Sequence, residues 1–110
     1  MKTFKPRIRA LKLAREFRKR LSKEIGQPVK VIMFGSQARG DANKESDIDL
    51  FVILPSLNND LMNLAFDVAW EVGFDAGKYI SVVPAEKNEI KRLEKSPFYQ
   101  AVKREGVLVE

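Results

Sequence analysis

The chain has 110 residues, of which 20 are Lys or Arg and 15 are Asp or Glu, and it contains neither Cys nor His. The missing residues exclude a disulfide framework, a cysteine zinc site, a Ser–His–Asp triad and any imidazole base or metal ligand. Any catalysis must therefore use carboxylates, hydroxyls, Lys, Arg or hard metal ions. A hydrophobic fraction of 45% predicts one soluble globular domain, residues 1–110, with an adequate core.

Charge is distributed unevenly along the chain. Residues 1–30 contain 11 basic and 2 acidic side chains, whereas residues 31–110 contain 9 basic and 13 acidic ones. This asymmetry predicts a solvated basic helix face; nucleic-acid binding through Arg15, Arg18 and Lys19 is a weaker alternative, because no exposed aromatic residues are interleaved for base stacking. No apolar run is long enough to span a membrane, and the basic start has no signal-peptide core. We therefore expect a cytoplasmic protein.

Hydrophobic periodicity and breaker residues predict the elements of the first half. Apolar residues at helical spacing predict a helix over residues 8–25, and a β-branched stretch predicts a strand over residues 29–34. The polar residues 36–46 are typical of a helical turn and a loop. The almost wholly apolar residues 48–54 predict a strand that is buried on both faces.

The second half alternates helices and strands in the same way. A helix begins after Asn58 or Asn59 and continues to Val72, with Gly73 as its end. The remaining elements are a strand over 79–83 ended by Pro84, a short helix within 86–94, a helix from Ser96-Pro97 to Gly106, and an edge strand over 107–109. This order predicts an α/β (α+β) domain with a small mixed sheet.

Two aspartates lie two residues apart at the start of the predicted strand 48–54. Asp47 and Asp49 should therefore point to the same face, while residues 48, 50, 52 and 54 anchor the opposite face in the core. Neighbouring carboxylates repel each other unless a cation lies between them. Mg²⁺ suits such a pair, since it takes one or two carboxylates and completes its coordination with water and substrate phosphates.

A Gly-Ser turn supplies a complementary site. Gly35 follows a strand and lets the backbone approach a phosphate, and Ser36 opens a helical turn whose free N–H groups and hydroxyl can hold a triphosphate. Gly35 and Gly40 have the spacing of P-loop glycines, but Asp41-Ala42 stands where the Lys-Ser/Thr of a P-loop is required. A phosphate site beside a metal site is what phosphoryl or nucleotidyl transfer requires.

Gly35-Ser36, ten residues and then Asp47-Ile48-Asp49 resembles the signature of the polymerase-β-like nucleotidyltransferases. The fuller string, Gly-Ser-Gln-Ala-Arg-Gly followed by Ser-Asp-Ile-Asp-Leu, is similar to their minimal (MNT) branch, and the resemblance covers the whole chain. It implies a small mixed sheet of the polymerase-β palm type, Mg²⁺ or Mn²⁺, and transfer of NMP, most often AMP from ATP, with release of pyrophosphate.

The resemblance also implies roles for individual residues. Gly35 and Ser36 would hold the nucleotide phosphates, and Asp47 and Asp49 would be the catalytic, metal-binding pair. Arg39 would lie near this nucleotide site, where it either pairs with an aspartate or contacts phosphate.

The same resemblance suggests where the acceptor comes from. Some members of the MNT branch are antitoxins that add AMP to a partner ribonuclease of the HEPN type. Others resemble kanamycin nucleotidyltransferase or larger polymerases, which have an additional substrate-binding domain. Because 110 residues leave no room for such a domain, we expect the acceptor to come from another protein, such as a HEPN-type partner, or from an oligomer.

The chain departs from the family pattern at one position. The family usually has a third carboxylate on the next strand, where it helps to bind a second metal and activates the attacking hydroxyl; here Ser81 occupies that position. Glu71, Asp75 and Glu86 are alternatives nearby in the sequence. Two interpretations therefore remain open: an active nucleotidyltransferase, and a catalytically weakened module that binds nucleotide or a partner.

The helix after Pro55 is apolar over an unusually wide arc. Two apolar stripes run along it, and the second contains Phe66 and Trp70. An arc this wide fits either full burial or an interface with a second copy or a protein partner, built around these two aromatic side chains.

Overall fold

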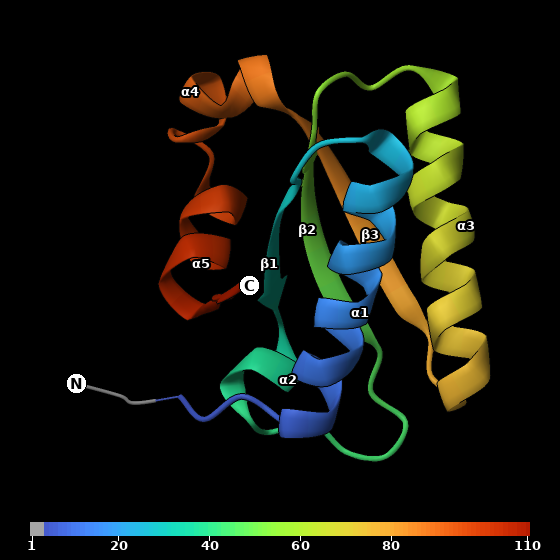
Figure 1. The fold of residues 1–110 in the computed structure, drawn as a ribbon. Helices are drawn as coiled ribbons and strands as arrows, with labels where there is room; N and C mark the ends of the chain where they lie inside the picture. The colour runs from blue at the N-terminus through green and yellow to red at the C-terminus, as the bar shows by residue number, and fades with distance from the viewer. Residues whose placement is uncertain (1–3) are drawn as a thin grey trace.

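Four strands form one mixed sheet in the order β3-β2-β1-β4 (Figure 1). The computed structural model describes residues 4–110, so the expected absence of a signal peptide lies partly outside the described residues. The strands are β1 (Lys30–Phe34), β2 (Ile48–Leu54), β3 (Ile80–Glu86) and β4 (Val107–Val109). β1 is antiparallel to both β2 and β4, and β2 is parallel to β3. The predicted α/β class with a small mixed sheet is confirmed.

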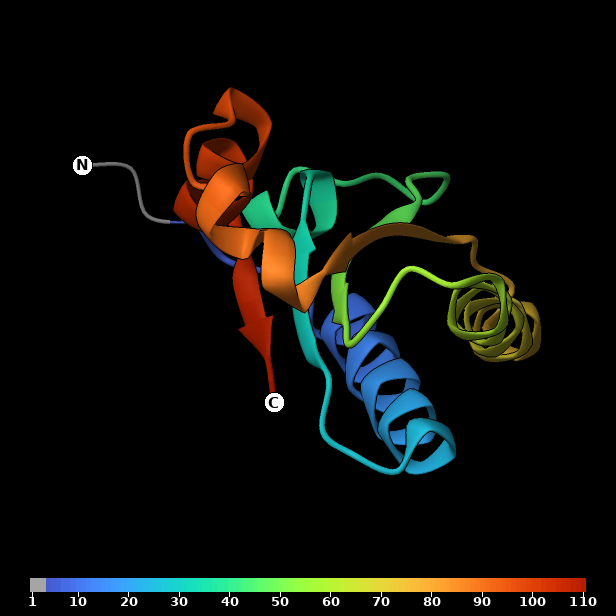
Figure 2. The same ribbon diagram turned by 90° about the horizontal axis from the view of Figure 1, so that it is seen from above.

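Helices cover both faces of this sheet (Figure 2). On one face α1 (Ile8–Ile25) packs beside α3 (Asn59–Ala76), and on the other lie α4 (Ile90–Leu93) and α5 (Pro97–Glu105). The single turn α2 (Ser36–Arg39) directly follows β1, and a 3₁₀ turn (Lys87–Glu89) precedes α4. Within residues 4–110 no helix is long and apolar enough to cross a membrane.

β2 separates two hydrophobic cores. Its residues 48, 50, 52 and 54 are buried together with side chains of α1 and α3. Phe51 and Ile53 belong to the second core, in which they lie with Tyr99 and Val102 of α5. The strand is therefore buried on both faces, as the continuous apolar run predicts.

α1 has the predicted bounds and presents its basic residues outward. Ala14, Phe17 and Leu21 are fully buried along one side, while Arg15 and Lys19 are exposed on the other. Arg18 is different, because its Nε donates to the Val29 carbonyl at 2.9 Å and so ties α1 to the start of β1. One of the three predicted nucleic-acid contacts is therefore engaged within the fold.

α3 continues one turn beyond the predicted end at Val72. It ends after Ala76, with Gly77 as the left-handed cap at φ 67°. Gly73 is glycine for another reason, since a Cβ there would overlap the backbone carbonyl of Lys78, where the chain returns toward β3. The glycine marks a close backbone approach and not a helix end.

β3 also continues beyond its predicted end, through Pro84 to Glu86. Pro84 pairs in register with Val52 of β2, and within residues 4–110 β3 has no other strand beside it. An edge strand tolerates proline because the missing N–H can lie on the side without a partner. The prediction that Pro84 ends the strand is therefore wrong.

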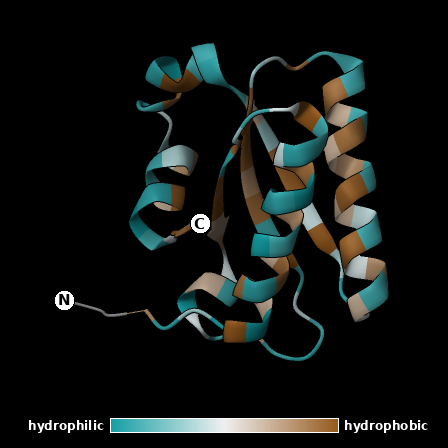
Figure 3. Cartoon of the chain, in the orientation of Figure 1, coloured by the Kyte–Doolittle hydropathy of each residue, from teal (hydrophilic) through white to brown (hydrophobic). Residues whose placement is uncertain are grey.

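The wide apolar arc of α3 is only partly buried. Ala65, Val68, Ala69 and Val72 lie in the core, but Phe66, Trp70 and Phe74 are 45%, 63% and 68% exposed. Hydropathy colouring shows apolar residues along much of this helix (Figure 3). We call these three exposed side chains the aromatic ridge. Full burial of the arc is thus wrong, and an interface at the ridge stays a prediction.

Gly73→Ala tests the close approach of α3 to the chain before β3. In an ordinary helix this change stabilises by about 1 kcal/mol; here we expect a loss of about 1–3 kcal/mol in the free energy of unfolding, because the new Cβ meets a backbone oxygen. Denaturant unfolding measures it. Asn63→Ala, on the exposed side of the same helix, is the control and should be neutral or slightly stabilising. A stabilised Gly73→Ala variant contradicts the analysis.

Candidate functional site

The end of β1 and the start of β2 place the Gly-Ser turn against the second aspartate. The antiparallel register pairs Phe34 with Asp49, and Gly35 follows directly with φ 74° and ψ −159°. A Cβ on Gly35 would overlap the Oδ2 atom of Asp49. Two constraints therefore require glycine at this position: the positive φ of the backbone, and the Asp49 carboxylate, which leaves no space for a Cβ. The predicted phosphate turn thus lies against Asp49, the second residue of the predicted acidic pair.

α2 begins at Ser36, directly after this contact. Its first internal bonds run from the N–H groups of Ala38 and Arg39 to the Gly35 carbonyl, at 3.1 and 3.0 Å. By helix geometry, the N–H groups of Ser36 and Gln37 have no acceptor within the helix. Two backbone donors and the hydroxyl-bearing Ser36 thus directly follow the glycine that packs against Asp49.

Gln37 fixes the loop that leads to Asp47, a role that the sequence analysis missed. Its side chain is buried, and its Nε2 donates to the Ser46 carbonyl at 3.1 Å. Within the loop, the Asn43 side chain accepts from the Glu45 N–H at 2.8 Å, and the Asn43 N–H donates to the Ser46 hydroxyl at 3.0 Å. These bonds set where Asp47 enters the site.

The two aspartates differ in environment. Asp47 is exposed just before β2, whereas Asp49 is half-buried on the sheet face that it shares with Phe51 and its strand neighbour Phe34. Burial raises the pKa of Asp49, the charge of Asp47 raises it further, and Arg39 partly opposes both. Ionisation of Asp49 is thus less favourable than that of a fully solvated aspartate.

The carboxylate oxygens of Asp47 and Asp49 are suitable ligands for a hard divalent cation. Among residues 4–110 no cluster of three or more metal-binding side chains exists, so the acidic pair is the candidate. Mg²⁺ is commonly held by one or two carboxylates, with water and substrate phosphates as its other ligands. A cation here would relieve both causes that raise the pKa of Asp49.

Arg39 lies near the site, but its ion pairs are with residues other than Asp47 and Asp49. Its Nε donates to Asp41 Oδ2 and its Nη1 to Glu105 Oε1, both at 3.3 Å. The second bond joins α2 to the end of α5. Arg39 thus pairs with an aspartate outside the acidic pair, and its contact with phosphate stays a prediction. Glu105 is 66 residues away in the sequence, and no local pattern points to it.

The parallel register of β2 and β3 places Ser81 directly beside Asp49. None of the three alternative acids replaces it. Glu86 pairs with Leu54 at the far end of the strands and accepts from the Leu57 N–H at 3.4 Å.

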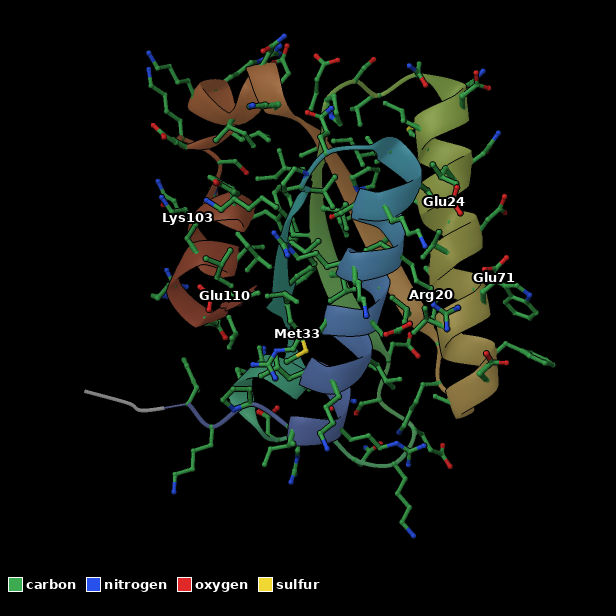
Figure 4. All side chains as sticks on the ribbon, viewed as in Figure 1. Arg20, Glu24, Met33, Glu71, Lys103 and Glu110 are labelled. Atoms are coloured by element: carbon green, nitrogen blue, oxygen red, sulfur yellow. The ribbon has the colours of Figure 1, made fainter. Side chains whose placement is uncertain are left out.

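The other two acids lie on α3, on the opposite face of the sheet. The charges of Asp75 and Glu71 act on Arg20, which projects from α1 toward α3 (Figure 4). The serine therefore occupies the position of the expected third carboxylate, with no acid from elsewhere in residues 4–110 beside it.

Comparison with known proteins identifies the family. Residues 14–107 match the model of the nucleotidyltransferase domain, so the chain belongs to this family and is a nucleotidyltransferase by descent. No curated protein sequence matches the chain significantly.

Two solved structures share the fold. A candidate nucleotidyltransferase from Sulfolobus solfataricus is 24% identical, with a TM-score of 0.53, and the match covers 92% of this chain and 79% of the other. A chain of a toxin–antitoxin structure with AMP-PNP is 18% identical, with a TM-score of 0.59 and coverage of 87% and 72%. The polymerase-β-like resemblance is confirmed at the level of family and fold.

Asp49→Asn tests the cost of ionising the Asp49 carboxylate and its fit to a cation. Because the pKa of Asp49 is raised in the folded protein, the stability due to its protonated form is present at low pH and lost as pH rises through the folded pKa. In EDTA at neutral pH we expect Asp49→Asn to raise the Tm, with no difference at about pH 3, where an aspartate is protonated in either state.

Addition of Mg²⁺ should reverse this order. It should raise the Tm of the wild type, by binding the folded state, and leave Asp49→Asn nearly unchanged. Asp60→Asn, on the exposed first turn of α3, is the matched control and should respond to Mg²⁺ as the wild type does. Equal Mg²⁺ responses of wild type and Asp49→Asn would contradict the assignment.

Proposed function

We propose that this nucleotidyltransferase transfers AMP from ATP, with Mg²⁺ or Mn²⁺, to a hydroxyl group of a partner protein. The observation that supports it best is the packing of Gly35 against the Asp49 carboxylate. A phosphate held at the Gly-Ser turn would lie beside the acidic pair. A metal site next to a triphosphate site is the arrangement that nucleotidyl transfer needs.

Each residue of the site has a role in this proposal. Gly35 and Ser36 bind the phosphates through backbone N–H groups and the serine hydroxyl. Asp47 and Asp49 hold the cation, which when bound neutralises charge on the phosphates. Arg39 holds α2 against α5 through Glu105 and has further N–H donors for the nucleotide.

The reaction forms one bond and breaks another. The acceptor hydroxyl oxygen bonds to the α-phosphorus of ATP, the bond from that phosphorus to pyrophosphate breaks, and the hydroxyl proton leaves. Ser81 is not a base at neutral pH, although it stands beside Asp49. The proton acceptor must therefore come from the partner protein or from solvent.

The aromatic ridge of α3 is the proposed docking surface for that partner. Aromatic side chains dominate the energetics of protein interfaces. The rings of Trp70 and Phe74 lie 5.5 Å apart between centroids, with their planes tilted by 34°. α3 contains four acids and no Lys or Arg: Asp60, Asp67, Glu71 and Asp75. Two copies joined at this helix would bring like charges together, so a partner with a basic rim, such as a HEPN-type protein in a toxin–antitoxin pair, is favoured over a homodimer.

A second candidate function follows from Ser81. Without a carboxylate beside Asp49, the chain would bind ATP or a partner with weakened chemistry. In either case we keep the expectations of a single minimal domain over residues 1–110 and a cytoplasmic location.

Label transfer from α-labelled ATP with Mg²⁺ tests the function. The wild type, purified together with its host partners, should label a protein band, and Asp47→Asn should lose at least about a hundredfold because the acidic pair is broken. Glu94→Gln, at an exposed position directly after α4, is the control and should label normally. Labelling that survives in Asp47→Asn would overturn the proposed site.

Ser81→Asp in the same assay separates the two candidate functions. Wild-type labelling that the variant leaves unchanged means that the partner or solvent already accepts the proton. If labelling appears only in Ser81→Asp, with a gain of about a hundredfold, the wild type is the weakened module. ATP that binds without labelling in any variant excludes transfer.

Trp70→Glu tests the docking surface. We expect partner binding to weaken by about thirtyfold or more, because a central aromatic contact is lost and a fifth acid joins α3. Leu57→Glu, at an exposed loop position, is the control and should bind normally. Light scattering of the purified chain measures the alternative: a dimer mass that falls to the monomer in Trp70→Glu establishes the homodimer, and an equal monomer mass excludes it.

A further inference from the structure

A cavity of about 430 Å³ lies near the end of the sheet where β2 begins. Its wall comes from the start of α1, from α2, from the loop before β2 and from the turn between α3 and β3. Ile48 belongs to its lining, and the Ile48 side chain packs with α1 and α3, on the opposite face from Asp49. The cavity is therefore separate from the candidate active site.

Four cationic side chains line this cavity and no acidic one does: Arg7, Arg9, Lys44 and Lys78. None of them takes part in an ion pair within residues 4–110. Like charges that converge on one cavity repel each other, and a bound anion removes that repulsion. The electrostatics of the cavity thus favour an anionic ligand.

Three of the four cations are held in place without being neutralised. Each donates to a backbone carbonyl of a different segment: Arg7 Nη2 to Ala42 at 3.0 Å, Arg9 Nη2 to Ala76 at 3.0 Å, and Lys78 Nζ to Lys44 at 2.8 Å. A guanidinium has five N–H donors and an ammonium three, so each keeps donors for a ligand. Each hydrogen bond restricts its side chain before a ligand arrives, which lowers the entropic cost of binding.

The remaining lining indicates the size and nature of the ligand. Ala10, Leu13 and Ile48 form an apolar part, and Gln37 and Asn43 add amide groups. Sites for small organic ligands usually measure about 300–1,000 Å³, so this cavity holds more than a phosphate ion alone.

We propose that this cavity binds a small phosphorylated organic molecule, with its phosphate among the four cations and its organic part on the apolar lining. The phosphate would accept charge-assisted hydrogen bonds from several segments at once. This proposal is independent of the proposed function, since it uses neither Asp47 nor Asp49.

The proposal has a structural consequence for the active site. Asn43 and Lys44 line the cavity, and the Gln37 amide that also lines it donates to the Ser46 carbonyl, next to Asp47. The ligand would therefore contact the loop that positions Asp47.

AMP is the probe, and binding is measured by calorimetry in EDTA on the Asp47→Asn/Asp49→Asn double variant, in which the candidate active site cannot hold a metal. We expect AMP to bind, and adenosine, which lacks the phosphate, to bind at least about tenfold more weakly. AMP binding that requires the two aspartates, or equal binding of adenosine, overturns the proposal. Because ATP-dependent labelling is absent from this assay, failure here does not bear on the proposed function.

Substitutions that remove two positive charges each, made in the Asp47→Asn/Asp49→Asn variant, test where AMP binds. Arg9→Gln/Lys78→Gln should weaken AMP binding by about tenfold or more, whereas Arg15→Gln/Lys19→Gln, on the exposed face of α1, should change it by less than about twofold. Lys44→Glu is the second variant, because no hydrogen bond of its side chain is found in the described part of the chain; it too should weaken binding.

Three outcomes would overturn the assignment. These are equal weakening by the two double removals, no weakening by Lys44→Glu, and a short RNA without terminal phosphate that binds more tightly than AMP and depends on Arg15 and Lys19. The last result would assign the basic charge to a nucleic-acid surface on α1.

Discussion

The contact between Gly35 and the Asp49 carboxylate is the constraint on which the candidate site depends. It exists because β1 and β2 are antiparallel neighbours and Phe34 pairs with Asp49, so the residue after Phe34 must pass the carboxylate. Burial of Ile48 and Leu50 on the opposite face prevents β2 from shifting, since a slip of one residue would turn those side chains out of the core. The hydrophobic core therefore fixes the distance between the phosphate turn and the acidic pair.

The same arrangement leaves an electrostatic imbalance. Burial and Asp47 both raise the pKa of Asp49, and the nearby cation, Arg39, is shared with Asp41 and Glu105. An arginine that is already paired with two carboxylates compensates a third only weakly. A cation bound between the two aspartates would offset both causes of the raised pKa, which supports the proposed metal site.

Local patterns predicted most of the fold, and the errors have tertiary causes. The bounds of α1 and β2 follow from periodicity and from flanking Gly and Pro, and the placement of Gly35 beside Asp49 follows from a short strand–turn–strand unit. The prediction that Gly73 and Pro84 end their elements is wrong because the constraints on them come from other segments. The Lys78 carbonyl lies against Gly73, and Pro84 belongs to an edge strand. Contacts between distant segments, such as Arg39 with Glu105, and the cavity lined by four separate segments leave no local pattern.

Ser81, where the chain departs from the family pattern, lies next to the proposed docking surface. Phe66, Trp70 and Tyr79 line one hollow of about 260 Å³ together with Ser81. A protein that covered the aromatic ridge would therefore also approach the edge of β3 at the residue beside Asp49. If the partner brings the proton acceptor, docking and completion of the site become one event. The chain alone would then bind nucleotide without consuming it, and transfer would be confined to the acceptor that fits the ridge.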